Sequence, residues 1–358
     1  MADKTPRYQE IADWLKENIR MGTFKSGEKL ISEPSLCEKF SISRHTVRAA
    51  ISILEQEGFV TRKQGSGTYV NHFISDGGRK KIGLLMTYAD DYIFPTIISS
   101  IEEILSEKGH SISLSLTQNK VENERNQLLS FLSDDIDGLI VEAAKSALPS
   151  VNLDIFKEFA RRSIPVIFIN TYHAHLNCNY IVNDDAEGGR LAVRHLVENG
   201  HRKIGGIFKH DDMQGNYRYK GFAEELYARN LKLHENHIAW FSTETLDSLF
   251  SADQVKLLLD RLAGVSGIVC YNDQVAVKLI QAFTQAGLSI PQDLSLVSFD
   301  NSNLSRITSV PLTSITHPGQ ETGRLAAETL LAIIDDPRRS IRHIYKPQLM
   351  VRDSVRKI

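Results

Sequence analysis

The strongest constraint on the fold is a long alternation of short apolar runs with helical segments. The apolar runs are residues 82–86, 138–141, 166–169, 204–208, 267–270 and 294–299, and the helical segments include 96–109, 185–200, 216–230 and 273–287. Buried strands that alternate with helices predict parallel, doubly wound sheets. Because the alternation runs to the end of the chain, which is longer than one such sheet needs, we expect two α/β lobes.

A different pattern occupies the first part of the chain. Residues 7–20 carry apolar side chains at three- and four-residue spacing, which predicts an amphipathic first helix. Ser32 and Ser43 each precede a helical segment, and serine is a favoured N-cap, so we expect a second and a third helix there. Two short β-prone runs, 59–62 and 68–71, follow with glycines between them. Three helices and a hairpin predict an α+β winged helix-turn-helix.

These patterns divide the chain into three parts. We expect the winged helix-turn-helix in residues 1–71 and the two-lobed domain in residues 82–358. Residues 72–81 show no apolar period and are predicted to be a linker. Residues 1–81 hold fourteen Lys and Arg against ten Asp and Glu, while the whole chain has a formal net charge of -2. This modest basic excess is compatible with DNA binding, but it is also typical of a solvated surface.

The composition also bears on the cellular compartment. The chain contains no apolar run of the roughly 18 residues needed to span a bilayer, and its first residues lack the apolar core of a secretory signal. Its three cysteines, Cys37, Cys178 and Cys270, are scattered and odd in number, unlike a disulfide framework. We therefore expect a cytoplasmic protein without a membrane partner, whose thiols are buried or half-buried.

The start of the third predicted helix carries side chains suited to DNA. Arg44, His45 and Arg48 lie at its exposed beginning. A helix that enters the major groove by its N-terminus places arginine against guanine edges, and its dipole favours nearby phosphates. Taken singly, these residues also fit an ordinary solvated helix start. Their position after two capped segments and before a glycine-tipped hairpin favours DNA contact.

Polar side chains follow four of the predicted strands of the two-lobed domain. They are Glu142 and Lys145, then Asp211, Asp212 and Gln214, then Tyr271, Asn272 and Asp273, and finally Asp300. The cleft at the carboxyl ends of parallel strands is the natural place for a ligand, where planar polar groups can bind sugar hydroxyls in pairs. Acidic residues at helix starts are more often N-caps, and this alternative applies most to Asp184, Asp185 and Asp273.

Residues 6–71 resemble the winged helix-turn-helix of gluconate-repressor-type (GntR) regulators. The shared motifs are Tyr8-x2-Ile11-Ala12-x2-Leu15, Gly27-x2-Leu30, Ser32-Glu33, Ser43-Arg44-x-Thr46-Val47-Arg48-x-Ala50, Glu57-Gly58 and Gly65-x-Gly67-Thr68-x-Val70. The resemblance implies that double-stranded operator DNA is the partner. The implied DNA contacts are Ser32, Glu33, Arg44, His45, Thr46 and Arg48, with Gln64, Gly65 and Ser66 on the wing.

Residues 82–355 resemble the effector domain of lactose- and galactose-repressor-type (LacI/GalR) regulators, which is similar to type I periplasmic sugar-binding proteins. The shared motifs are Gly200-His201-x2-Ile204-x2-Ile207, Arg218-x2-Gly221-Phe222, Asn272-Asp273-x2-Ala276, Gly287-x2-Ile290-Pro291-x-Asp293-Leu294-Ser295, Phe299-Asp300 and Pro311-Leu312-Thr313-Ser314-Ile315. The resemblance implies that Arg218, Asn272, Asp300 and His317 contact a sugar effector.

The pairing of these two parts is similar to the arabinose-operon repressors of Gram-positive bacteria. That resemblance implies L-arabinose or a related sugar as the inducer, and it adds Glu142, Lys145 and Asp212 to the effector contacts. It also implies a repressor of sugar-utilisation genes that the sugar releases from DNA. The residues themselves do not separate arabinose from another pentose or hexose. We expect a homodimer, because one reading head makes too few contacts for useful specificity.

Three other functions are an enzyme, a sugar-transport component and a transcriptional activator. The neighbouring pairs Asp184-Asp185 and Asp211-Asp212 are reminiscent of acid/base catalysis, but side chains on consecutive residues usually point apart. His173, His175 and Cys178 lack a fourth metal ligand of their own. We therefore expect no enzyme, no catalytic residue, no metal and no cofactor. A sugar-transport component is opposed by the N-terminal DNA reader, and activation instead of repression stays open.

Overall fold

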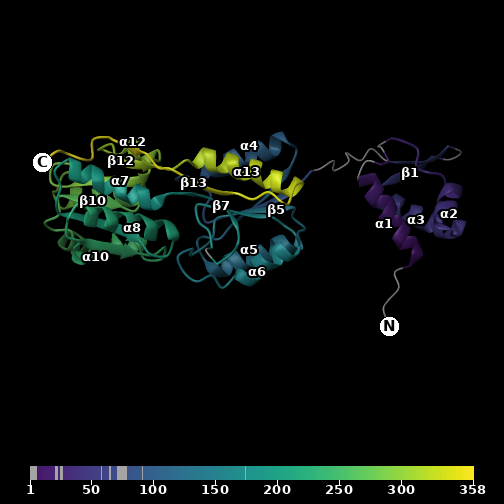
Figure 1. The fold of residues 1–358 in the computed structure, drawn as a ribbon, viewed down its shortest axis with the longest axis horizontal. Coiled ribbons are helices and arrows are strands. Elements are labelled where there is room, and N and C mark those ends of the chain that lie inside the picture. The colour runs from purple at the N-terminus through teal and green to yellow at the C-terminus, as the bar shows by residue number, and fades with distance from the viewer. Residues whose placement is uncertain are drawn as a thin grey trace. The chain divides into compact units, whose positions relative to one another are not determined.

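The computed structural model describes residues 6–20, 23–24, 27–57, 59–63, 66–70, 79–90, 92–173 and 175–358. The chain forms two compact units, Met1–Arg79 and Lys80–Ile358 (Figure 1). Of the predicted linker 72–81, positions 72–78 lie outside the described residues.

The first unit contains three helices and a hairpin. These are α1 (Arg7–Arg20), α2 (Glu33–Phe40), α3 (Arg44–Gln56), β1 (Val60–Lys63) and β2 (Gly67–Val70), with the two strands antiparallel. The Oγ atoms of Ser32 and Ser43 accept hydrogen bonds from the backbone N–H groups of Ser35 and Thr46, both at 3.3 Å. The predicted N-caps are thus confirmed, and with them the starts of α2 and α3.

The three helices of this unit meet around one small core. The apolar stripe of α1 supplies Ile11 and Leu15, which pack with Leu36 of α2 and with Val47 and Leu54 of α3. Burying this shared face leaves the polar N-terminal turn of α3 exposed to solvent. The core therefore fixes the direction in which the candidate DNA-reading side chains project.

The second unit begins with a lobe built on a six-stranded sheet in the order β13-β7-β6-β5-β3-β4, all paired in parallel. Its strands are β3 (Lys81–Met86), β4 (Ser111–Leu116), β5 (Gly138–Val141), β6 (Val166–Ile169), β7 (Asn179–Asn183) and β13 (Arg342–Tyr345). Helices α4 (Phe94–Glu107) and α13 (Gly319–Asp335) cover one face, and α5 (Val121–Ser133) and α6 (Leu153–Arg161) cover the other (Figure 1). We call this the N-lobe.

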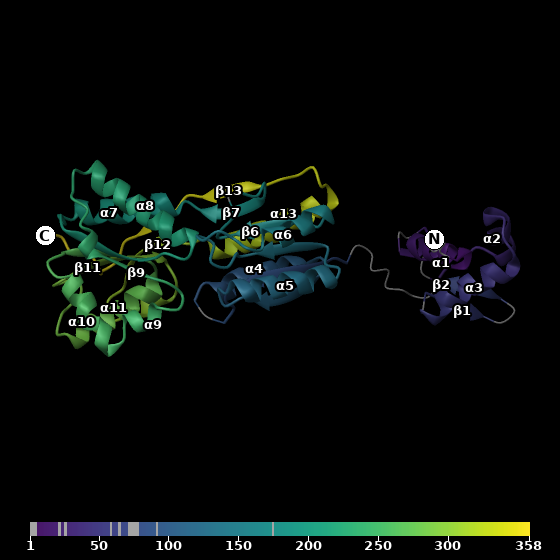
Figure 2. The same cartoon turned by 90° about the horizontal axis from the view of Figure 1, so that it is seen from below.

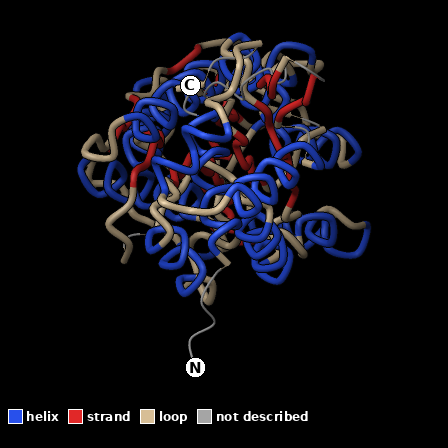
Figure 3. The backbone as a smooth tube through the Cα atoms, turned by 90° about the vertical axis from the view of Figure 1, so that its right-hand side faces the viewer, coloured by secondary structure: helices blue, strands red, loops and turns tan. Residues whose placement is uncertain are grey.

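The remaining elements form the C-lobe, whose sheet has the order β14-β12-β11-β10-β8-β9. Its strands are β8 (Ile204–Lys209), β9 (Ile238–Phe241), β10 (Gly267–Cys270), β11 (Ser295–Asp300), β12 (Thr313–Thr316) and β14 (Leu349–Met350), of which only β14 is antiparallel. The helices are α7 (Asp185–Glu198), α8 (Met213–Ala228), α9 (Leu246–Leu249), α10 (Ala252–Arg261), α11 (Asp273–Gln285) and α12 (Leu304–Ile307), with a 3₁₀ turn at Glu235–His237. Figure 3 colours the whole chain by secondary structure, with strands in red and helices in blue.

The chain passes between the lobes at three described points, from β7 to α7, from β12 to α13 and from β13 to β14. Each lobe is thus completed by segments from distant parts of the sequence, as Figure 2 shows for α13 and β13 in the N-lobe. The predicted two-lobed α/β fold is confirmed. Within the described residues, no helix has the length and apolarity needed to cross a membrane.

Candidate functional site

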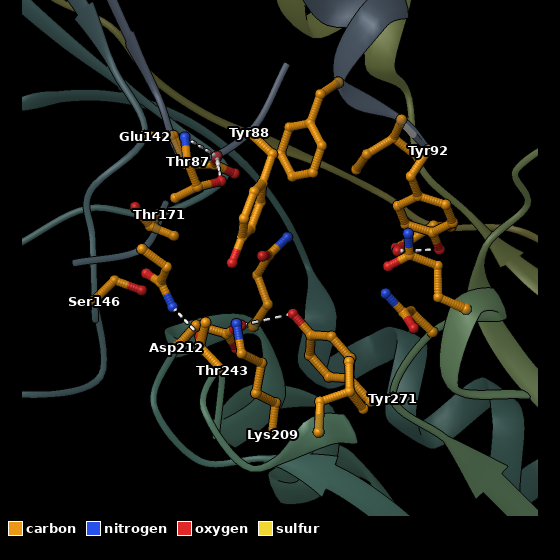
Figure 4. A pocket seen from close by; sticks show the side chains of 18 of the residues that line it. Thr87, Tyr88, Tyr92, Glu142, Ser146, Thr171, Lys209, Asp212, Thr243 and Tyr271 are labelled. Carbon is orange, nitrogen blue, oxygen red and sulfur yellow. Dashed lines mark hydrogen bonds and ion pairs between the residues drawn. The ribbon is translucent and has the colours of Figure 1, made fainter. Parts of the chain in front are cut away.

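A cavity of about 200 Å³ lies between the two lobes, at the carboxyl ends of their strands (Figure 4). Residues that follow β3 and β5 line it from the N-lobe, and residues at or just after the ends of β8, β10 and β11 line it from the C-lobe. Four of the predicted effector residues are part of its lining, namely Glu142, Asp212, Asn272 and Asp300. Lys145, Arg218 and His317 are not among the described residues that line it.

Arg218 lies buried beneath the cavity, with 2% of its surface exposed. Its guanidinium donates to Asp185 Oδ1 at 2.8 Å, to the backbone oxygen of Tyr271 at 2.6 Å and to Asp300 Oδ1 at 2.9 Å. The guanidinium carbon also lies 4.4 Å from the ring centroid of Phe299. Arg218 therefore holds Asp300 in place in the cavity wall without lining the cavity itself.

Two glycines allow Arg218 to reach this position. A Cβ atom on Gly221 would lie 1.8 Å from the backbone oxygen of Ala186, and one on Gly189 would lie 2.2 Å from the backbone oxygen of Arg218. Helices α7 and α8 therefore approach each other more closely than side chains would permit. This contact brings Asp185 at the start of α7 next to Arg218 on α8.

Two of the lining residues are also helix N-caps. Asp212 Oδ1 accepts from the N–H of Gly215, and Asn272 Oδ1 accepts from the N–H of Val275. Both side chains therefore cap a helix, and each of them also lines the cavity. Asp212 Oδ2 accepts from the Tyr271 hydroxyl at 2.6 Å, a bond drawn in Figure 4.

The predicted cap Asp184 is confirmed, since its Oδ1 accepts from the N–H of Glu187. Asp273 is instead enclosed by Ser298, Ser302 and Ser314, which all donate to its carboxylate. Burial raises the pKa of Asp273 to about 6. This carboxylate fixes the start of α11 and is not in the lining.

A chain of hydrogen bonds supports Glu142 from behind. The Thr87 hydroxyl donates to Glu142 Oε2, and the Asn170 amide donates to Glu142 Oε1 at 2.8 Å. Asn170 Oδ1 in turn lies 3.1 Å from His317 Nε2. Burial lowers the pKa of His317 to about 4, so the imidazole is neutral at pH 7. His317 is thus connected to the cavity only indirectly, through Asn170 and Glu142.

Asp300 also receives a bond from the opposite lobe. Tyr92 lies just before α4 in the chain, and its hydroxyl donates to Asp300 Oδ2 at 2.7 Å. Both oxygens of Asp300 are therefore engaged, one by Arg218 and one by Tyr92. Tyr92 itself lines the cavity, as do Tyr88 and Tyr271.

Several lining residues were missed by the predictions from sequence. Thr87 and Tyr88 directly follow β3, and Thr171 is the second residue after β6, so inspection of the strand ends would have found them. Lys209 is the last residue of β8, and its ammonium lies 3.1 Å from Asp212 Oδ2. Tyr92 carries no such signal, because it precedes a helix and meets the cavity only through the lobe arrangement.

In the first unit, the side chains of Arg44 and His45 are exposed at the start of α3, and Thr46 is half-buried beside Ser43. Arg48 Nε donates to Glu33 Oε2 at 3.0 Å, which ties α3 to α2. The positive charge of Arg48 and the negative charge of Glu33 therefore lie next to each other on the surface of the unit.

The other predicted DNA contacts lie around α2 and the wing. Ser32 is engaged as the N-cap of α2, and Ser66 is exposed, with its Oγ 2.6 Å from the Tyr69 hydroxyl. Gln64 and Gly65 lie outside the described residues.

Comparison with protein-family models matches residues 7–70 to the bacterial regulatory proteins of the gntR family. Residues 193–355 match a periplasmic binding protein-like domain. Among solved structures, a periplasmic binding protein/LacI transcriptional regulator from Alkaliphilus metalliredigens complexed with D-xylulofuranose has a TM-score of 0.64 and 27% identity, covering 77% of this chain and 99% of that one. The predicted resemblance of each part of the chain is confirmed.

Two relatives match the chain over nearly its whole length. The arabinose metabolism transcriptional repressor of Halalkalibacterium halodurans is 37% identical, over 97% of this chain and 96% of the relative. The protein of the same name from Geobacillus stearothermophilus is 36% identical over 100% of both chains. Transcriptional repressors are not enzymes, which confirms the expectation of no catalysis. The chain therefore belongs to the family of bacterial arabinose metabolism transcriptional repressors, in which a gntR-type winged helix-turn-helix precedes a two-lobed periplasmic binding protein-like domain.

Proposed function

We propose that this protein represses sugar-utilisation genes in the cytoplasm and leaves its operator when L-arabinose binds between the two lobes. The observation that carries the proposal is the small cavity that both lobes line with carboxylates and aromatic rings, in a chain that also has an exposed, basic helix start at α3. A ligand that contacts both lobes favours one relative orientation of them. By linkage, sugar and DNA then oppose each other's binding by about 1–3 kcal/mol, which is a factor of roughly 5 to 150 in affinity.

The charges in the cavity favour a neutral sugar. Three carboxylates line it, those of Glu142, Asp212 and Asp300, and the only cationic side chain among its described lining residues is Lys209. That ammonium is already paired with Asp212 at 3.1 Å. Asp300 is likewise paired with the buried Arg218 at 2.9 Å. A phosphate or carboxylate would therefore find no unpaired cation among the described lining residues, whereas sugar hydroxyls can donate to the carboxylates. The volume lies below the roughly 300–1,000 Å³ of pockets for drug-sized ligands, which fits a monosaccharide.

Aromatic rings supply the second element of sugar recognition. Tyr88 and Tyr92 enter the cavity from the N-lobe, and Tyr271 enters from the C-lobe (Figure 4). Such rings can cover the apolar faces of a sugar while the carboxylates bind its hydroxyls. The choice of L-arabinose within this proposal is supported by the names of the two relatives above and not by these contacts.

For DNA, we propose that the N-terminal turn of α3 enters the major groove. Arg44 and His45 are exposed there, and Thr46 and Arg48 lie on the same turn and the next. Ser32 and Glu33 at the start of α2 and Gln64, Gly65 and Ser66 on the wing are the further contacts that the resemblance implies. Arg44→Ala should weaken specific binding by about 1–3 kcal/mol if Arg44 reads a base, but lower affinity for all sequences alike if it contacts phosphate.

A homodimer would place two reading heads on a pseudo-palindromic operator. Exposed apolar side chains on two of the sheet edges, β4 and β9, support self-association. They are Leu114 and Leu116 on β4, which are 43% and 38% exposed, and Trp240 on β9, which is 40% exposed. Proteins normally cover or charge such edges, so an apolar edge favours a partner. Sedimentation of the full chain at micromolar concentration measures its oligomeric state directly.

The proposed function is tested by thermal unfolding of the full chain with a panel of neutral pentoses and hexoses, arabinose 5-phosphate and arabinonate. The sugar that binds raises the Tm by mass action, and at 100 times its Kd the stabilisation is about 2.7 kcal/mol. We expect L-arabinose to act, the two anions to be inert, and the same sugar to release labelled operator DNA. A panel without any stabilising sugar would refute the effector proposal.

A further inference from the structure

Lys145 joins the two lobes at one end of the cavity. It lies in the loop after β5 of the N-lobe, and its ammonium lies 2.6 Å from Asp211 Oδ2 and 2.6 Å from Glu244 Oε1 in the C-lobe. The pair with Asp211 is shielded from water, since the side chains of Lys145 and Asp211 are 13% and 2% exposed. Burial would lower the pKa of Lys145, but the bonds to both carboxylates outweigh it and raise the pKa.

The ammonium has no hydrogen left for a sugar. A lysine ammonium has three N–H donors, and here they face Asp211 Oδ2 and both carboxylate oxygens of Glu244, the second of these at 2.7 Å. Neither Lys145 nor Glu244 is among the described residues that line the cavity. The sugar contact that the resemblance implied for Lys145 therefore has no support in this geometry.

The backbone of Lys145 is held in an unusual conformation by its neighbours. Its φ is +47°, a left-handed conformation that a side chain other than glycine seldom adopts. Its N–H donates to Asn119 Oδ1 at 2.7 Å, and the amide of Asn119 donates across the cleft to Thr243 Oγ1. Beside it, Ser146 Oγ accepts from the N–H of Met213 on the C-lobe at 3.0 Å. The N-lobe loops after β4 and β5 thus make polar contacts with two C-lobe segments, at residues 211–213 and 243–244.

We propose that Lys145 is a positioning residue that holds the lobes closed, and that it sets sugar affinity through this closure without touching the sugar. The proposal rests on the proposed function in so far as the ligand is a sugar. If closure is needed for tight binding, the apparent Kd equals the intrinsic Kd divided by the closed fraction. Loss of the Lys145 contacts then multiplies the Kd of every sugar by one common factor. A residue that touches the sugar would instead change the ratio between sugars.

The test uses three variants of the full chain. Lys145→Met removes the ammonium and keeps the apolar stem, and Glu244→Ala removes the more exposed partner while leaving the buried pair with Asp211 intact. Asp247→Ala is the matched control, because Asp247 forms an exposed ion pair with Lys278 at 3.1 Å within the C-lobe. The control removes the same charge three positions away without affecting any cross-lobe contact.

The first readout needs no sugar. The amide of Met213 is in the first turn of α8 and is bonded across the cleft by Ser146 Oγ. Hydrogen–deuterium exchange of peptides that contain Met213 should therefore speed up in Lys145→Met and Glu244→Ala and stay at the wild-type rate in Asp247→Ala. Wild-type exchange in both test variants would overturn the proposal, whatever the protein binds.

The second readout is calorimetric Kd for two sugars that bind the wild type. We expect Glu244→Ala to raise both Kd values by a common factor of roughly 2–5, in keeping with a partly exposed ion pair, and Lys145→Met to raise both by roughly tenfold or more. Asp247→Ala should leave them unchanged. Unequal factors for the two sugars, or no effect of Glu244→Ala, would refute closure as the mechanism. If no sugar binds the wild type, the proposed function fails while the exchange result still decides the role of Lys145.

Discussion

Replacing Arg218 with methionine is the most direct test of how the sugar-site framework is stabilised. The change keeps the apolar stem but removes three hydrogen bonds in a site where Asp185 and Asp300 are only 7% and 6% exposed. Removing one partner of a buried ion pair costs roughly 3–5 kcal/mol, because the other charge is left uncompensated. We therefore expect the unit Lys80–Ile358 to lose about 4 kcal/mol in its free energy of unfolding. At roughly 2–4 °C per kcal/mol for a large domain, its Tm should fall by about 8–16 °C.

Differential scanning calorimetry of the full chain measures this loss, and Arg190→Met is the control. Arg190 lies on the neighbouring helix α7 and pairs with Glu187 at 2.6 Å and Glu224 at 2.7 Å, but these side chains are 28% to 44% exposed. Exposed pairs contribute about 0–1 kcal/mol, so the control should shift the Tm by at most a few degrees. Operator affinity should survive in Arg218→Met, since the reading unit Met1–Arg79 does not contain the substitution. Equal Tm shifts in the two variants would refute the reasoning.

The pH dependence of Arg218→Met provides a second check. Burial raises the pKa of Asp185 to about 6 even with Arg218 beside it. A carboxyl whose folded pKa lies above its unfolded value stabilises the fold at low pH, and this contribution is lost as pH rises through the folded pKa. Without Arg218 the pKa of Asp185 rises further, so the variant should approach the wild type in stability as pH falls from 7 toward 5. A gap that widens on acidification would contradict this account.

Three further predictions concern packing, capping and a buried histidine. Gly221→Ala should destabilise the second unit by about 1–3 kcal/mol in calorimetry, because its Cβ would lie 1.8 Å from Ala186 O; an unchanged Tm would show that α7 and α8 can separate freely. Ser43→Ala should lower helix stability in the first unit by about 1 kcal/mol in urea unfolding and weaken operator binding through α3, whereas Ser43→Asp, which keeps a capping oxygen, should restore the stability. Burial lowers the pKa of His173 to about 4, so its neutral form stabilises the fold above the unfolded value of about 6.5, and this stabilisation is lost as pH falls toward 4. His173→Phe should therefore lose less Tm than the wild type between pH 7 and pH 4.5, and parallel curves would show that His173 does not titrate in this way.

The local pattern of the sequence was enough for the main elements. Strands β5, β6 and β10 begin and end where the apolar runs do, and the caps at Ser32 and Ser43 start their helices as expected. These features depend on side-chain period and on hydrogen bonds within four residues, so neighbouring residues contain the whole signal. The position of polar residues after strands likewise placed Glu142 and Asp300 at the cavity, because parallel strands share one carboxyl edge.

The sequence alone therefore determined the two-part architecture and the edge of the sheets at which a ligand can lie. Only the tertiary structure decided which polar residues face the cavity and which face each other. Arg218 and Asp300 are 82 positions apart, and Lys145 and Glu244 are 99 positions apart. Such pairs leave no periodic trace, because they form only when two lobes completed by distant segments come together. The fold consequently places Arg218 beneath the cavity and Lys145 across its end, although the same strand-end and motif arguments had assigned both of them to the sugar.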